Sequence, residues 1–161
     1  MDEKDDTRER IIEAARRRFL HYGYGKTTMA EIAKDCDMSP GNLYRYFEGK
    51  LDLAEEIAQR DATETISELT RSIRSPGKTA TQAMRDYLFG KLRVTFGKLE
   101  KDPKIIELAQ IVSNERPNFA RDVLARERQT LMEILSNGRE LSEFSVTDLA
   151  YTAEMIQAAT M

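Results

Sequence analysis

The stretch TTMAEIAKDCDMSPGNLYRYF, residues 27–47, contains two short helical patterns joined by a tight turn. Thr28 and Glu31 form a capping box, which predicts that the first helix begins directly after Thr28. Ser39 is a strong N-cap residue, and Pro40 suits the first helical position because it has no N–H to leave unpaired. Two helices at this spacing are typical of a helix-turn-helix, which places its second helix in the DNA major groove.

The second of these helices is expected to bury one face and expose the other. Leu43 and Phe47 lie four residues apart and should face inward. The outer surface then carries Asn42, Tyr44, Arg45 and Tyr46. This set suits polar recognition better than solubility alone. A short helical hairpin can also be plain structure or a protein contact, and this alternative stays open for residues 27–47 taken alone.

Helical patterns flank this stretch on both sides. Asp6 and Glu9 form a second potential capping box. An apolar helical stripe follows it, made of Ile11, Ile12, Ala15, Phe19 and Leu20. Gly23 is placed to end this helix in a left-handed conformation. Lys50 begins a long amphipathic pattern, so three helices precede a fourth and the third is the candidate for DNA contact.

The first third of the chain carries one continuous pattern: Phe19-x3-Gly23-Tyr24-x2-Thr27-Thr28-Met29-x2-Ile32-Ala33-x4-Met38-Ser39-x-Gly41-x-Leu43-Tyr44-x-Tyr46-Phe47-x2-Lys50-x2-Leu53. This pattern resembles the N-terminal domain of the tetracycline-repressor-like (TetR) family, with no gap in the spacing. The chain departs from the family at Cys36-Asp37 in the turn, where the family often has Ala-Gly.

The resemblance implies DNA contacts at ten positions. Residues that would hold backbone phosphates are Thr27, Thr28, Ser39, Tyr44 and Tyr46, with Lys50 as a further phosphate anchor. Residues that would lie nearest the base edges are Pro40, Gly41, Asn42 and Arg45. By chemistry, Arg45 suits guanine through paired bonds to O6 and N7, and Asn42 suits adenine. For each position the alternative is a solvated helix surface.

Beyond Lys50 the pattern stays helical and nothing alternates as strands do, so we expect an all-α fold. The expected helices are residues 50–75, stopped by Pro76-Gly77; 79–96; 102–116, begun by Asp102-Pro103 and ended by Pro117; 118–136, closed by Asn137-Gly138; and a last one from near Ser145. We expect a helix-turn-helix domain at residues 1–49 and a helical ligand-binding and dimerisation domain at 50–161, connected by helix 50–75. Because the chain ends at Met161 inside an apolar helical pattern, its C-terminus is expected to be incomplete.

The family resemblance also implies a homodimer and a small-molecule effector. Residues 118–136 and 145–161 would pair across a two-fold axis, although their leucines could instead fill a monomeric core. One short helix contacts few base pairs, whereas two related by symmetry recognise half-sites about 34–36 Å apart. An apolar effector pocket would be lined by Met84, Tyr87, Leu88, Phe96, Ile111 and Phe119, for which simple core packing is the alternative.

The charge distribution favours selective DNA binding. The chain has a formal net charge of −3, yet from Thr7 to Lys50 it carries nine Lys and Arg against six Asp and Glu. A modestly basic segment on an acidic chain suits a protein that binds double-stranded DNA through this segment, with an affinity that depends strongly on salt. One cysteine, no secretory signal and no long apolar run predict a cytoplasmic protein without a membrane partner.

Catalysis is not expected. His21 falls in the last turn of a predicted helix and Cys36 falls in a turn, and no cluster has metal-ligand spacing, so we expect no metal and no cofactor. The sequence therefore predicts a DNA-binding transcriptional regulator, a ligand-responsive repressor that binds a palindromic operator as a dimer. An activator would use the same residues. The rival from another class is a helical protein-interaction adaptor without sequence-specific DNA binding.

Overall fold

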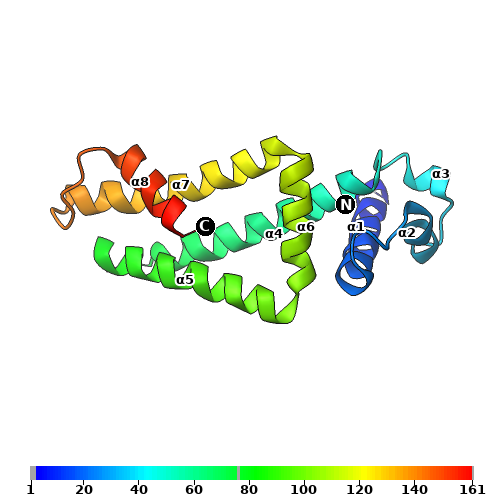
Figure 1. Cartoon of the computed structure of the whole chain (residues 1–161), viewed down its shortest axis with the longest axis horizontal. Coiled ribbons are helices and arrows are strands. Elements are labelled where there is room, and N and C mark those ends of the chain that lie inside the picture. The colour runs from blue at the N-terminus through cyan, green and yellow to red at the C-terminus, as the bar shows by residue number, and fades with distance from the viewer. Residues whose placement is uncertain (1–2, 76, 161) are drawn as a thin grey trace. The chain divides into compact units, whose positions relative to one another are not determined.

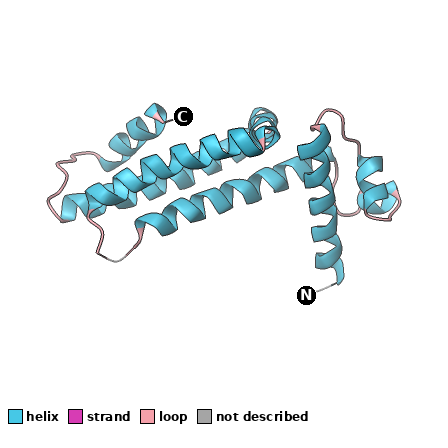
Figure 2. Ribbon diagram, turned by 90° about the horizontal axis from the view of Figure 1, so that it is seen from below, coloured by secondary structure: helices cyan, strands magenta, loops and turns pink. Residues whose placement is uncertain are grey.

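The computed structural model describes residues 3–75 and 77–160, in which every regular element is a helix (Figure 2). In chain order (Figure 1) they are α1 (Glu3–Tyr22), α2 (Met29–Asp35), α3 (Pro40–Leu43), α4 (Lys50–Ile73), α5 (Ala80–Lys101), α6 (Pro103–Glu115), α7 (Pro117–Glu140) and α8 (Leu149–Ala159). The predicted all-α fold is confirmed. No helix of the described residues is long and apolar enough to cross a membrane.

The helices pack into two compact units. Unit 1 takes the chain up to Asp61 together with Lys98–Phe119, and unit 2 takes Ala62–Gly97 together with the chain from Ala120 onward. Helix α6 therefore packs with the helix-turn-helix, against α1. Helix α4 gives its first half to unit 1 and its second half to unit 2. The division into domains at residue 49 stays a prediction.

The predicted capping box starts α2. The Thr28 hydroxyl accepts a hydrogen bond from the Glu31 backbone N–H at 3.3 Å, and the Glu31 carboxylate accepts one from the Thr28 N–H at 2.8 Å. Met29, Ile32 and Ala33 are buried, as their spacing predicts. These side chains pack into the core of unit 1 with the buried stripe of α1 (Ile11, Ile12, Ala15 and Phe19) and with Leu53, Ala54 and Ile57 of α4.

The first helix begins earlier than its sequence pattern indicates. Asp6 was expected to cap α1, but α1 begins at Glu3 and Asp6 lies inside it. Acidic side chains in a first turn favour the positive end of the helix dipole, so they extend a helix as well as cap one. The other end is as predicted, because Gly23 follows Tyr22 with φ +92° and its N–H bonds to the Phe19 carbonyl at 3.0 Å.

Several helix ends in the second half of the chain differ from prediction. Helix α5 continues through Gly97 to Lys101, and α7 continues through Asn137-Gly138 to Glu140. The last helix begins at Leu149 rather than near Ser145, and the Asp148 side chain caps it by accepting from the Tyr151 N–H. Helix α6 begins at Pro103 as predicted, although Asp102 forms no side-chain cap. Pro76 and Met161 lie outside the described residues.

Within unit 2, two contacts fix the α7–α8 loop to α5 and α7. The Glu143 carboxylate accepts hydrogen bonds from the backbone N–H groups of Ala80 and Thr81 at 3.1 and 3.0 Å, and so caps α5. The Phe144 ring lies against Gly138, where a Cβ would come within 2.1 Å of the ring. Phe144 also packs on the core of unit 2, which consists of Leu69, Ile73, Ala83, Tyr87, Leu131, Ile134, Leu135 and Ala153.

Candidate DNA-binding site

The turn between α2 and α3 is formed by residues 36–39. Cys36 is buried, and its N–H closes α2 by bonding to the Ile32 and Ala33 carbonyls. Asp37 has φ +54°, a left-handed conformation that glycine adopts most easily and that Asp tolerates better than most residues. Asp37 therefore takes the position where the TetR family often has glycine, and the turn closes with the Met38 N–H on the Ala33 carbonyl at 3.0 Å.

Helix α3 is short and is held by two buried side chains. The Ser39 hydroxyl accepts a hydrogen bond from the Asn42 N–H at 3.2 Å, and Pro40 occupies the first turn, both as predicted. After Leu43 the backbone tightens into turns, with the Tyr46 N–H bonded to the Leu43 carbonyl at 2.9 Å. Leu43 is 0% exposed and Phe47 is buried, which confirms that both face inward.

Nine of the ten predicted DNA contacts have accessible side chains or backbone. The exposed ones are Thr28, Ser39, Pro40, Gly41, Tyr44 and Arg45, and the half-buried ones are Asn42, Tyr46 and Lys50. The Arg45 side chain forms no hydrogen bond or ion pair with another described residue, so its guanidinium is available to a ligand. The role of these positions in DNA contact stays a prediction.

Thr27 and Lys50 point toward the protein. Thr27 is 1% exposed and its hydroxyl donates to the Gly23 carbonyl at 3.0 Å, so this side chain presents nothing to a phosphate. The Lys50 ammonium donates to the carbonyls of Tyr24 and Thr27. The sequence pattern missed both orientations, because neither depends on the spacing of residues within one helix.

Arg18 joins α1 to α2 through charge. Its guanidinium donates to both carboxylate oxygens of Asp35, at 2.6 and 3.0 Å, and lies 3.4 Å from Glu31. Of the three consecutive arginines at residues 16–18, Arg18 is therefore engaged in an ion pair within the protein. The hydrogen bond from Arg18 holds the pKa of Asp35 below its usual range. The pair fixes α2, whose N-cap is Thr28, against α1.

Stability is expected to depend on this pair in a defined pH range. Because the folded-state pKa of Asp35 is depressed, its contribution is fully present above the unfolded pKa of about 3.9 and is lost as pH falls through the lower folded value. Urea unfolding of Arg18→Met should show a stability deficit at pH 7 that shrinks below about pH 4. Lys26→Met, an exposed change in the same domain, should show no such pH-dependent deficit; a deficit for Arg18→Met that is constant down to pH 2 would contradict this account.

Two basic residues at the ends of α6 attach this helix to α4 and α1, and no pattern in the sequence indicated either attachment. The Arg116 guanidinium, between α6 and α7, donates to Asp52 at 2.9 Å and to Glu55 at 3.1 Å, both on α4. The Lys104 ammonium donates to the carbonyl of His21 at the end of α1. The partners are 61 to 83 residues apart, so no local pattern reports them.

The predicted effector-pocket residues fall in both units. Ile111 and Phe119 belong to unit 1, whereas Met84, Tyr87, Leu88 and Phe96 belong to unit 2. Tyr87 is buried in the core of unit 2, with Met84 and Leu88 packed against that core. Phe96 is 59% exposed, because it lies nine residues, or about two and a half turns, after Tyr87 and so on the opposite face of α5. The Tyr87 hydroxyl is buried without a hydrogen-bond partner among the described residues, and burial raises its pKa.

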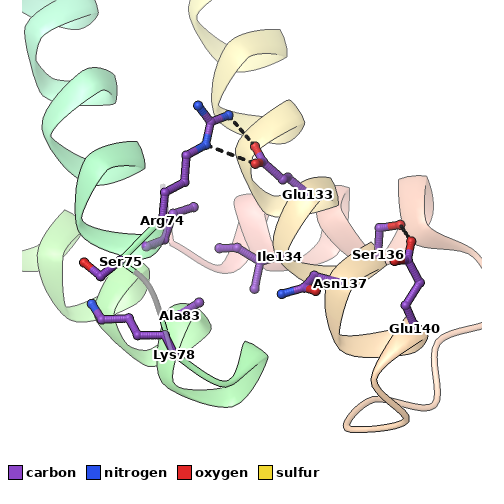
Figure 3. A pocket seen from close by; sticks show the side chains of 10 residues that line it. Arg74, Ser75, Lys78, Ala83, Glu133, Ile134, Ser136, Asn137 and Glu140 are labelled. Atoms are coloured by element: carbon purple, nitrogen blue, oxygen red, sulfur yellow. Dashed lines mark hydrogen bonds and ion pairs between the residues drawn. The ribbon is translucent and has the colours of Figure 1, made fainter.

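A groove of about 590 Å³ lies in unit 2 between the end of α4, the start of α5 and the last turns of α7 (Figure 3). Its lining includes Ile73, Ala83 and Ile134 as the apolar part, with Arg74 and Glu133 paired beside them at 2.8 and 3.0 Å. None of the six predicted pocket residues lines it. Within the described residues, no group of three or more His, Cys, Asp and Glu could hold a metal ion.

Two protein-family models match the chain and together cover most of it. The model of the bacterial regulatory proteins of the tetR family matches residues 11–57, and the tetracyclin repressor-like C-terminal domain matches residues 80–161. The regulator UidR of Escherichia coli (strain K12) is 35% identical over 71 residues, which are 44% of this chain. That stretch spans 36% of UidR, about a third of its length.

Solved structures share the fold along nearly the whole chain. A transcriptional regulator from Cytophaga hutchinsonii is 29% identical with a TM-score of 0.73, over 94% of this chain and 76% of its own. SmeT of Stenotrophomonas maltophilia in complex with triclosan is 20% identical with a TM-score of 0.67, over 96% and 77%. The capped helix-turn-helix, the helical second unit and both family models agree, and the chain belongs to the tetR family of bacterial regulatory proteins.

Proposed function

We propose that this protein is a transcriptional regulator that binds a palindromic DNA operator as a homodimer. The observation that carries the proposal is the exposed surface of α3 and the turn after it, where Arg45 follows a Ser39-capped helix and its side chain has no partner among the described residues. An arginine left without an acceptor suits a guanine edge, to which it donates two hydrogen bonds. Repression, rather than activation, is the role typical of the family.

The contacts divide by chemistry into those that position and those that specify. Thr28, Ser39, Tyr44 and Tyr46 carry hydroxyl groups suited to phosphates, which fix the orientation of the domain without reading sequence. The residues proposed to approach the bases are Pro40, Gly41 and Asn42 of α3 and Arg45 in the turn after it. Because the Thr27 hydroxyl is buried and bonded, we leave this side chain out of the proposed interface.

Dimerisation is proposed through α8 rather than α7. Tyr151 and Met155 are 62% and 52% exposed and lie one turn apart on α8, so they form an apolar strip open to a second copy. Helix α7 exposes no large apolar side chain. A two-fold axis through α8 would let the two α3 helices recognise symmetric half-sites.

An effector site is proposed in unit 2. The triclosan complex of SmeT supports a small-molecule ligand for a protein of this fold. In unit 2 the unpaired Tyr87 hydroxyl is a buried donor that an acceptor group on a ligand, or a water molecule, would satisfy. Binding there would lower operator affinity by the same factor by which operator lowers effector affinity. Helix α4, shared by both units, is the proposed connection.

Selection of bound sequences from a random DNA pool tests the proposed function. Recovery of a palindrome is expected, together with a dimer in sedimentation. In Arg45→Ala the preference should relax at one base pair per half-site, at a cost of about 1–3 kcal/mol there. Arg71→Ala, an exposed arginine on α4 in unit 2, should change neither preference nor affinity. No enriched motif at low salt would favour the adaptor function instead.

A further inference from the structure

The Lys50 side chain is held by the loop that precedes α2. Its ammonium donates to the Tyr24 carbonyl at 2.8 Å and to the Thr27 carbonyl at 2.9 Å, and lies 4.2 Å from the centre of the Tyr24 ring. Two of its three donors are used by the protein, and its charge faces an aromatic ring. One N–H donor of the ammonium is left over.

The loop itself offers few other partners for these carbonyls. The Gly23 carbonyl accepts from the Thr27 hydroxyl, and the Tyr24 carbonyl accepts from the Thr27 N–H at a long 3.3 Å. Among the described residues, the Thr27 carbonyl accepts its hydrogen bond from the Lys50 ammonium. Removing the ammonium therefore leaves this acceptor, next to the N-cap of α2, without its hydrogen bond.

We propose that Lys50 is a positioning residue, which ties residues 24–27 to the start of α4 and so fixes Thr28 and the beginning of α2, rather than a phosphate anchor. The inference rests on the proposed DNA interface, because Thr28 is one of its phosphate contacts. Hydrogen bonds from a charged donor are stronger than neutral ones, and two of them converge on one short loop. The two hydrogen bonds from Lys50 to the Tyr24 and Thr27 carbonyls form in the free protein, without DNA.

The test combines a measurement without DNA and one with DNA on Lys50→Met. In the free protein, amide hydrogen exchange at Thr27 and Thr28 should accelerate while exchange at Leu43 in α3 stays unchanged. Affinity for the selected operator should fall about tenfold, as expected for losing a charged hydrogen bond that pre-orders the interface. The slope of log affinity against log salt should equal that of the wild type, because no phosphate contact is lost.

Two variants keep the test decisive. Lys50→Arg retains the charge but replaces the compact ammonium with a planar fork, so it should also accelerate exchange at Thr27 and Thr28. It also serves if Lys50→Met does not fold. Lys26→Met, an exposed lysine in the same loop, should leave this exchange unchanged.

Unchanged exchange at Thr27 and Thr28 in the Lys50 variants overturns the proposal, and so does a salt slope shallower by about 0.9, the value for one lost phosphate contact. Loss of DNA binding by the wild type would instead refute the proposed function, while the exchange measurement would still decide the role of Lys50.

Discussion

Leu43→Ala is expected to lower the free energy of unfolding by about 2–5 kcal/mol, the usual cost of a large cavity in a packed core. Leu43 is the buried residue of α3, a helix of four residues, and it is 0% exposed. The backbone bonds that follow it, from the N–H groups of Tyr46 and Phe47, both end on its carbonyl. Operator affinity should fall with stability, equally for every sequence, because the whole helix loses its attachment.

Tyr44→Ala is the matched control on the neighbouring residue. Tyr44 is 51% exposed, so its removal should change the unfolding free energy by only about 0.5 kcal/mol. Urea unfolding followed by circular dichroism measures both variants under the same conditions. If Leu43→Ala were no less stable than Tyr44→Ala, the buried Leu43 side chain would not be what holds α3 in place.

Gly138→Ala is expected to destabilise unit 2 by about 1–3 kcal/mol, the cost typical of overpacking. A Cβ at Gly138 would lie 2.1, 2.6 and 2.8 Å from three carbons of the Phe144 ring, so the ring must leave its position. Displacing it also loosens the loop whose Glu143 carboxylate caps α5. The gain in helix propensity from glycine to alanine, about 1 kcal/mol, opposes this effect and is smaller than the steric cost.

Gly97→Ala measures the effect of helix propensity on stability without a steric clash. Gly97 lies within α5, and a Cβ there would meet nothing within 4 Å. This variant should therefore gain about 0.5–1 kcal/mol, raising the midpoint of thermal unfolding where Gly138→Ala lowers it. Equal shifts in the same direction for the two variants would show that the Phe144 contact has no steric role.

The helix-turn-helix could be predicted from sequence because its determinants are local. The Thr28–Glu31 capping box, the Ser39 cap and the left-handed Gly23 each act within four residues, and all three occur as predicted. Helix ends in the second half of the chain were harder to predict from sequence. Asn137-Gly138 has the composition of a helix end, yet α7 continues to Glu140, because glycine there makes room for Phe144 instead of turning the chain.

The sequence by itself determined the helical class, the caps of α2 and α3 and the family of this protein, because caps and apolar periodicity are interactions between near neighbours in the chain. Only the tertiary structure decided which polar side chains are bonded within the protein. Arg18 is paired with Asp35 across 17 residues and Lys50 with the Thr27 carbonyl across 23, whereas the Arg45 side chain has no such partner among the residues that the structure describes. Whether a charged side chain faces DNA or the protein depends on acceptors that folding brings close, and their positions are not encoded in local spacing.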